Sequence, residues 1–131
     1  MKKFFLLFSF LFFAFAIHAQ KINSDSLKSK FAFENIQNQK LFGDSLTSSF
    51  VIFIKKEVPL HKHIFHSEHV WILEGEAEMI LGNEKFKISK GDCIFIPKNT
   101  PHKVSVTSSI PLKIISIQSP NFDGSDRVLL E

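Results

Sequence analysis

Short apolar runs alternate with turn-forming residues along most of this chain, from Lys40 to the C-terminus. The runs recur about every 8–12 residues, a spacing typical of β-strands in a sandwich or barrel. No long helical pattern interrupts them, and Gly82-Asn83 has the size and composition of a two-residue hairpin loop. The sequence therefore predicts an all-β domain over residues 40–131, for which a double-sheet jelly roll is a suitable architecture. The predicted strands are Lys40–Phe42, Thr47–Ile54, Val70–Leu73, Ala77–Leu81, Lys85–Ile88, Cys93–Ile96, Lys103–Thr107 and Leu112–Gln118.

The residues before this domain differ from it in composition. A short basic start is followed by an apolar run from Phe4 to Ile17 and by a small residue, Ala19. This pattern predicts a secretory signal peptide over residues 1–19, cleaved before Gln20. A membrane anchor is the alternative, but the run is shorter than the roughly 20 apolar residues that span a bilayer. We therefore expect a secreted or periplasmic protein without stable membrane insertion after cleavage.

Residues 20–39 are mainly polar and predict a flexible lead-in. The strands that follow are less polar than a free-standing antiparallel sandwich requires, because Phe50–Ile54 and Val70–Leu73 are apolar on both faces. Something must cover the second face of these strands. A second copy of the chain is the simplest cover, so a homodimer is expected. The lead-in is the other candidate.

The net charge and the cysteine content limit the possible partners and the possible disulfide bonds. The formal net charge of +3 includes Lys2 and Lys3 of the expected signal peptide, so the mature chain carries about +1. With no basic run or stripe, no nucleic-acid partner is expected. Cys93 is the single cysteine, which excludes an internal disulfide, and its apolar neighbours predict a buried structural thiol.

Three histidines and one carboxylate carry the clearest chemistry. His61 and His63 are two residues apart, so both leave the same face of a β-strand. Glu68 follows after the length of a tight turn, and His102 begins a later predicted strand. Three nitrogens and one oxygen suit a divalent transition metal, such as Mn, Fe, Zn, Ni or Cu.

The same residues resemble the two sequence signatures of the cupin superfamily. The stretch from His61 to Gly75 is similar to the first signature, in which two spaced histidines precede a glutamate and a glycine. The stretch from Gly91 to His102 is similar to the second. The departures are Lys55 and Asn99 at positions usually held by glycine, and Val106 at a position usually held by asparagine. Asn99 is a mild change, because asparagine tolerates the left-handed backbone that a turn glycine provides. The resemblance covers roughly residues 45–118. It implies a jelly-roll barrel with the metal inside and one or two coordination positions left for water or substrate.

Two further histidines, His66 and His69, lie close to the predicted ligands in the sequence. If Glu68 points inward on a regular strand, His69 and Trp71 point outward. His66 lies in the turn between the ligand strands, where it is either an exposed turn residue or a substrate contact at the rim. A β-bulge beside the ligands would invert these assignments. The tail over residues 119–131 predicts a closing turn, and no site residue is expected there.

Two functions remain open at this point. The first is a metalloenzyme acting on a small oxygen-bearing molecule, such as a sugar derivative or an organic acid. Cupins carry oxygenase, isomerase, lyase and decarboxylase chemistry, and the ligand set does not choose among them. No catalytic residue is identified, and His66 is the only acid or base candidate near the ligands. The second function is a non-catalytic module of the cell envelope that binds a small ligand or a metal.

Overall fold

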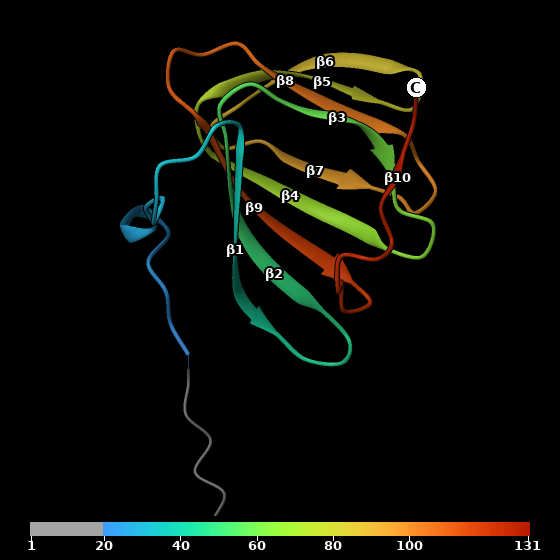
Figure 1. Ribbon diagram of the computed structural model, residues 1–131, viewed down its shortest axis with the longest axis horizontal. Helices are drawn as coiled ribbons and strands as arrows, with labels where there is room; N and C mark the ends of the chain where they lie inside the picture. Colours follow the sequence, from blue (N-terminus) through green and yellow to red (C-terminus); the bar gives the residue numbers. More distant parts are fainter. Residues whose placement is uncertain (1–19) are drawn as a thin grey trace, which may run out of the picture.

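The computed structural model of the protein describes residues 20–131, and the expected signal peptide lies outside them. Within this range, one 3-10 turn at Ser24–Ser26 precedes ten β-strands (Figure 1). The strands are β1 Ile36–Gly43, β2 Ser48–Ile54, β3 Glu57–Lys62, β4 Ser67–Glu74, β5 Glu76–Leu81, β6 Glu84–Ser89, β7 Cys93–Ile96, β8 His102–Val106, β9 Leu112–Ser119 and β10 Val128–Leu129. No helix among these residues is long and apolar enough to cross a membrane.

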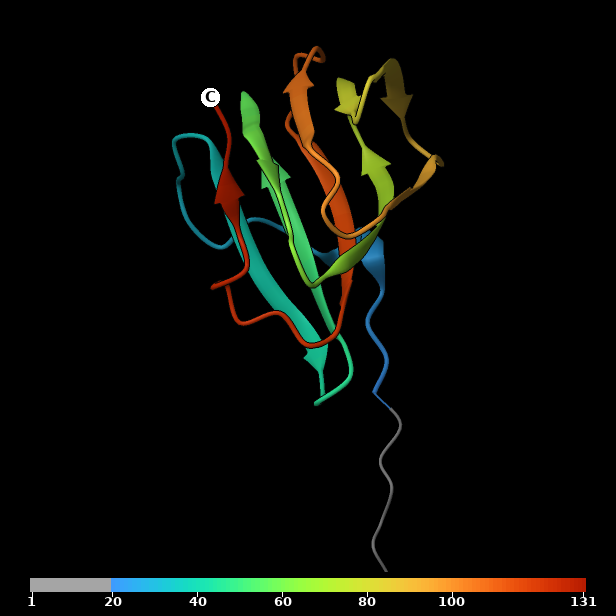
Figure 2. The ribbon, with the colours of Figure 1, turned by 90° about the vertical axis from the view of Figure 1, so that its right-hand side faces the viewer.

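The strands form two antiparallel five-stranded sheets that face each other. The first sheet has the order β1-β2-β9-β4-β7 and the second has the order β10-β3-β8-β5-β6. The short strand β10 lies at the edge of the second sheet, beside β3 (Figure 2). The predicted all-β jelly roll is confirmed.

Alternation along the strands builds the core between the sheets. On β4, Glu68, Val70 and Ile72 are buried, whereas His69 and Trp71 are exposed, as the period of two predicts. Isoleucine, valine, leucine and methionine from both sheets fill the interior. The chain passes from the first sheet to the second at Gly75, where φ is +83°. A Cβ at Gly75 would lie 2.9 Å from the main chain of the segment before β9, so this crossing requires glycine.

Several strand boundaries differ from the prediction. β3 was not among the predicted runs, because Glu57, Pro59 and Lys62 interrupt its apolar pattern. β1 begins at Ile36, inside the segment expected to be lead-in, and the tail adds β10. The prediction of a buried thiol was wrong. Ile94 and Ile96 take the inner side of β7, which leaves Cys93 exposed on the outer side.

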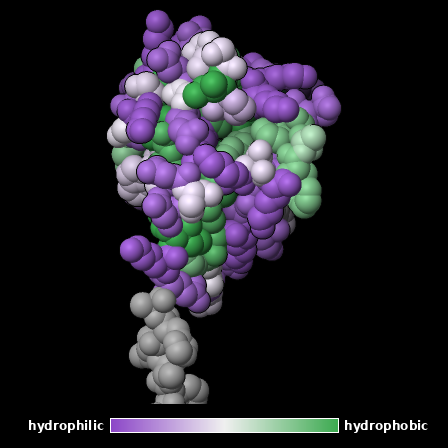
Figure 3. Space-filling model, turned by 90° about the vertical axis from the view of Figure 1, so that its left-hand side faces the viewer, coloured by the Kyte–Doolittle hydropathy of each residue, from purple (hydrophilic) through white to green (hydrophobic). Residues whose placement is uncertain are grey.

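The lead-in covers part of the outer surface of the first sheet. The Gln37 side chain accepts a hydrogen bond from the Lys30 main chain at 2.8 Å, and the Gln39 side chain donates one to the Lys28 carbonyl at 3.1 Å. These glutamines pair with Phe53 and Val51 of β2, which are buried although they face outward. Figure 3 shows this side of the molecule, where hydrophilic side chains surround scattered hydrophobic areas. The lead-in therefore lies beside this part of the sheet, and Val51 and Phe53 are already buried within the single chain.

The outer side of β4 and β7 stays open. Trp71 is 39% exposed and Phe95 is 51% exposed, and each of them has the His69 ring beside it. The predicted homodimer would therefore form through this open surface.

Candidate metal centre

The three predicted histidine ligands come together on the inner side of the second sheet. His61 lies on β3 and pairs directly with His102, the first residue of β8, while His63 follows the end of β3. All three are buried. One ring nitrogen from each lies within 4.8 Å of the other two. The sequence prediction that these residues share one site agrees with this placement.

An irregularity in β3 precedes the histidines without disturbing their common face. The pairing of β3 with β8 shifts register between Val58 and His61. Pro59 lies inside this bulge, where a residue without an N–H group breaks no ladder hydrogen bond. Because the bulge ends before His61, it does not change the directions of the side chains that follow. His61, His63 and Glu68 still point inward, and His69 still points outward.

The turn before β8 holds the two sequence signatures together. Asn99 has a φ of +60°, which confirms that asparagine supports the left-handed backbone at this position. Its main-chain N–H donates a hydrogen bond to the carbonyl of His63. The turn leading to His102 is thus tied directly to the main chain of another predicted ligand.

Each of the three histidines is oriented by a hydrogen bond to main chain. The Nδ1 atom lies next to a carbonyl oxygen and donates its hydrogen to it, which leaves Nε2 as a lone-pair donor. Among the described residues, Nε2 of His102 is buried without a hydrogen-bond partner. A buried nitrogen of this kind is suited to a metal ion. The carbonyl acceptors are those of Pro59 for His61 at 2.8 Å, Thr100 for His102 at 3.0 Å, and Asp126 for His63.

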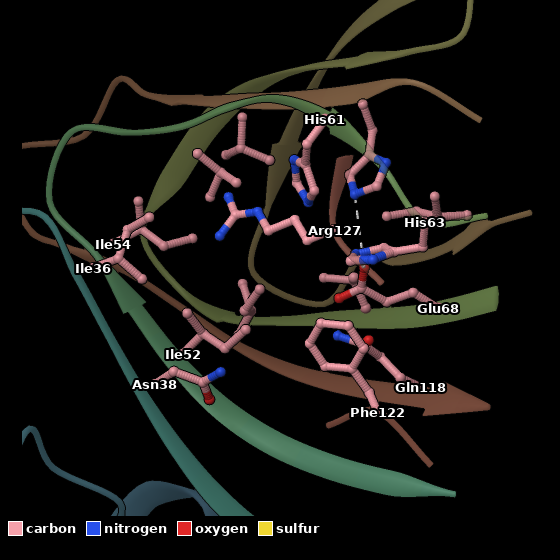
Figure 4. Close-up of a pocket in the computed structure, with 16 residues that line it drawn as sticks. Ile36, Asn38, Ile52, Ile54, His61, His63, Glu68, Gln118, Phe122 and Arg127 are labelled. Atoms are coloured by element: carbon pink, nitrogen blue, oxygen red, sulfur yellow. Dashed lines mark ion pairs between the residues drawn. The ribbon is translucent and has the colours of Figure 1, made fainter. Parts of the chain in front are cut away.

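Glu68 reaches the cluster from the opposite sheet. Its Oε2 atom lies 3.9 Å from Nε2 of His63 and 3.8 Å from Nε2 of His102 (Figure 4). Two atoms bound at about 2.1 Å to the same ion lie about 3–4 Å apart, so these distances fit a shared metal. The Ser116 hydroxyl donates a hydrogen bond to the other carboxylate oxygen and fixes its direction.

Electrostatics favour neutral imidazoles at this site. Burial, followed by the nearby His102, lowers the pKa of His61 to about 3. Burial also lowers the pKa of His102, although the Thr100 carbonyl and Glu68 act in the opposite direction. Both rings are therefore neutral near pH 7, which is the form that binds a metal.

His66 does not occupy the position expected of a substrate contact. It is buried, with Nδ1 2.6 Å from the Asp126 carboxylate and Nε2 3.2 Å from the Asn121 carbonyl. Both ring nitrogens are therefore used within the fold, and His66 is not part of the cavity wall. The expectation of an exposed turn residue is also wrong, because the tail folds over this turn.

Asp126, which the sequence analysis did not single out, fastens the tail to the ligand loop. Its carboxylate accepts main-chain hydrogen bonds from Ile64, Phe65 and His66 at 2.7–3.1 Å. Burial raises the pKa of Asp126, but the bonds from His66 and the main chain outweigh this effect and lower the pKa to about 2. The tail therefore supports the site, contrary to the expectation that it holds no site residue.

A cavity of about 160 Å³ opens next to the cluster, between the two sheets. Arg127 forms part of its wall, and its side chain extends among the pocket residues in Figure 4. Arg127 is exposed as a whole residue, so it stands at the cavity mouth. Gln118 also lines the cavity, and its Oε1 atom is buried without a partner in the described part of the chain. The apolar wall consists of Ile36, Ile52, Ile54, Val58, Val70, Ile96, Val104, Ile114 and Phe122.

Comparison with known protein families places this site in context. Residues 50–118 match the family described as the cupin domain. The chain belongs to the cupin family. The matched region of this cupin contains all four predicted ligands, His61, His63, Glu68 and His102, so the resemblance carried by the two signatures is confirmed.

Relatives in other organisms match over parts of the sequence. An uncharacterized protein of Methanocaldococcus jannaschii is 46% identical over 72 residues, which are 55% of this chain and 58% of that protein. An uncharacterized protein of Aquifex aeolicus is 39% identical over 99 residues, covering 75% of this chain and 80% of the relative. A mannose-1-phosphate guanylyltransferase of Salmonella muenchen is 36% identical over 67 residues, 51% of this chain, but these are only 14% of the enzyme.

Solved structures share the fold. KdgF from a Halomonas species superposes with a TM-score of 0.70 at 20% identity, covering 82% of this chain and 97% of that structure. A conserved Klebsiella pneumoniae protein with a double-stranded β-helix domain gives a TM-score of 0.72 at 16% identity, covering 87% and 99%. At these identities the likeness concerns the cupin fold alone.

Proposed function

We propose that this cupin binds one divalent transition metal ion through His61, His63, His102 and Glu68. The observation that carries the proposal is the convergence of three buried imidazoles whose Nδ1 atoms are all engaged by main-chain carbonyls. That arrangement presents the Nε2 lone pairs to a common centre, beside a carboxylate held by Ser116. Mn, Fe, Zn, Ni and Cu all accept such a nitrogen and oxygen donor set.

The chemistry follows from the position of the centre at the cavity wall. A bound metal of this class supplies a Lewis acid that polarises an oxygen-containing group or lowers the pKa of water. The apolar residues of the cavity exclude water around a bound molecule, and Gln118 offers an amide oxygen to it. We propose a metalloenzyme that acts on a small oxygen-bearing molecule, a sugar derivative or an organic acid, by oxygenase, isomerase, lyase or decarboxylase chemistry.

A non-catalytic binding module is the second candidate. Among the described residues that line the cavity, Arg127 is the only ionisable one apart from the four proposed ligands. Arginine stays protonated and does not exchange protons at neutral pH. His66 is fully engaged elsewhere, so the cavity has no separate general acid or base. This observation favours ligand capture over reactions that require one.

Export and assembly are further parts of the proposal. We propose that residues 1–19 are a signal peptide and that the mature cupin works in the periplasm or outside the cell. Intact-mass analysis of protein from its native compartment tests this, and a mass that retains these residues would contradict it. We also propose a homodimer through the open surface around Trp71 and Phe95, since large exposed aromatic groups are typical of interfaces.

Metal analysis of a set of variants tests the central proposal. His61→Ala, His63→Ala and His102→Ala should each lose most of the bound metal at pH 7.5, measured by elemental analysis per chain. His69→Ala is the matched control, because this exposed histidine lies on the outer face of β4 and should keep full occupancy. Full occupancy in a His61/His102 double variant would exclude the site. Turnover that depends on the metal in a substrate screen would then separate the enzyme from the binding module.

A further inference from the structure

Arg127 is the only arginine of the chain, and its side chain is unpaired. Within residues 20–131, no side-chain hydrogen bond and no ion pair closer than 4 Å involves it. It nevertheless lines the cavity that contains Glu68 and the histidine cluster. A planar guanidinium has five N–H donors arranged to match a carboxylate. A free guanidinium at a cavity mouth is therefore suited to an anionic group of a ligand.

The main chain on both sides of Arg127 is anchored, which fixes the origin of this side chain. Before it, the Asp126 carboxylate is bonded to the ligand loop. After it, Val128 pairs with Lys62 of β3, and the Leu130 N–H donates to the Leu60 carbonyl. The tail thus holds Arg127 at a set distance from the cluster instead of leaving it on a free end.

The remaining wall restricts the rest of the ligand. Nine of the sixteen lining residues are apolar, and they come from both sheets. A ligand with a hydroxyl group on every carbon would place several of its hydroxyl groups against isoleucine and valine without a hydrogen-bond partner. Burial of such unpaired hydroxyl groups is unfavourable. Two uncharged polar residues, Asn38 and Gln118, also line the cavity. Asn38 is exposed on β1, whereas the unpartnered Oε1 of Gln118 is buried close to Glu68 and Ser116, where it is free to accept a hydrogen bond from the ligand.

From this arrangement we infer that the ligand is a small carboxylic acid with an apolar body and one hydroxyl group next to the carboxylate. The carboxylate binds Arg127, the hydroxyl group lies at the metal and Gln118, and the body packs between the isoleucines of the cavity. This inference rests on the proposed metal site and selects the organic acid over the sugar derivative.

Three matched probes test the inference by calorimetry on the purified protein loaded with Co²⁺. The probes are 2-hydroxyhexanoate, gluconate and 1,2-hexanediol. Gluconate keeps the carboxylate and the chain length but carries hydroxyl groups along the body, whereas the diol keeps the apolar body and lacks the carboxylate. We expect 2-hydroxyhexanoate to bind at least tenfold more tightly than either. Equal or tighter binding of gluconate or of the diol would overturn the inference.

Two variants assign the preference to Arg127. Arg127→Gln should weaken binding of 2-hydroxyhexanoate roughly ten- to hundredfold, as expected for loss of a charge-assisted contact, and leave diol binding unchanged. Lys85→Gln removes the same charge from an exposed residue paired with Glu78 and should have no effect. Unchanged binding of 2-hydroxyhexanoate by Arg127→Gln would refute the role of Arg127. Failure to bind Co²⁺ would instead refute the metal site, so the two proposals fail separately.

Discussion

The bond network of Asp126 gives the sharpest test of how the tail supports the site. Its carboxylate accepts four hydrogen bonds, three from main-chain N–H groups and one from the His66 ring. Asp126→Asn keeps the shape of the side chain and turns one acceptor oxygen into an amide donor. In the better orientation the amide oxygen keeps the Phe65 and His66 donors, and the amide NH2 group then faces the Ile64 N–H, which it cannot satisfy.

The size of the effect follows from the lost bond to Ile64 and from the loss of the charge that strengthens the other three bonds. A hydrogen bond to a charged group contributes about 1.5–3 kcal/mol, but water reaches part of this loop and the losses do not add fully. We therefore expect Asp126→Asn to lower the free energy of unfolding by about 3–4 kcal/mol, or Tm by roughly 10–15 °C. Because the Asp126 carbonyl also orients His63, metal affinity should fall about tenfold or more.

Thermal unfolding of the metal-free protein and metal titration measure the two effects. Asp123→Asn is the matched control, since this exposed aspartate in the same tail bonds only to Ser125. It should change Tm by no more than a degree or two, in line with other exposed sites. Equal Tm values for the Asp126 and Asp123 variants would refute the idea that the tail is fastened through this carboxylate.

Three further predictions follow from the site and the outer surface. Glu68→Gln should retain more metal than His102→Ala, because it keeps a neutral oxygen near the centre, and elemental analysis would show the order. The metal-free protein should lose stability as pH falls from about 6.5 toward 3, by up to about 1.4 kcal/mol per pH unit from His61. The sign follows because the unfolded chain binds a proton that the buried ring resists. Urea unfolding should show this slope, and His61→Gln should reduce it; an unchanged slope would exclude His61 as the cause. Trp71→Arg should convert the proposed dimer to a monomer in light scattering, and a wild-type monomer at micromolar concentration would contradict the dimer itself.

Local sequence patterns were sufficient for most of the strands and for the histidine cluster. Alternation of period two gave the inward and outward faces of β4. It failed for Cys93, because a run of apolar residues on one strand does not reveal which parity faces the core. It also missed β3, in which proline and charged residues conceal the alternation.

The contributions of the tail could not be predicted from local sequence patterns. Asp126 bonds to residues about sixty positions earlier in the chain, and Arg127 lines a cavity together with such residues, but no spacing rule connects them. Asp126-Arg127 also follows a Gly and a Ser, which gave the segment the composition of a closing turn. Similarly, the lead-in shows its role only once Gln37 and Gln39 are known to face outward. Such contacts are set by how the sheets close on each other.

The histidine orientations have a consequence for the evolution of this cupin. The atoms that orient His61, His63 and His102 are main-chain carbonyls, which every residue type possesses. A substitution at Thr100 therefore changes a side chain without deleting the acceptor of His102, as long as the backbone keeps its course. Natural selection is thus free to alter the cavity wall and its ligand preference while the geometry of the centre is inherited unchanged. Glu68 is the exception, because its partner is the replaceable hydroxyl of Ser116.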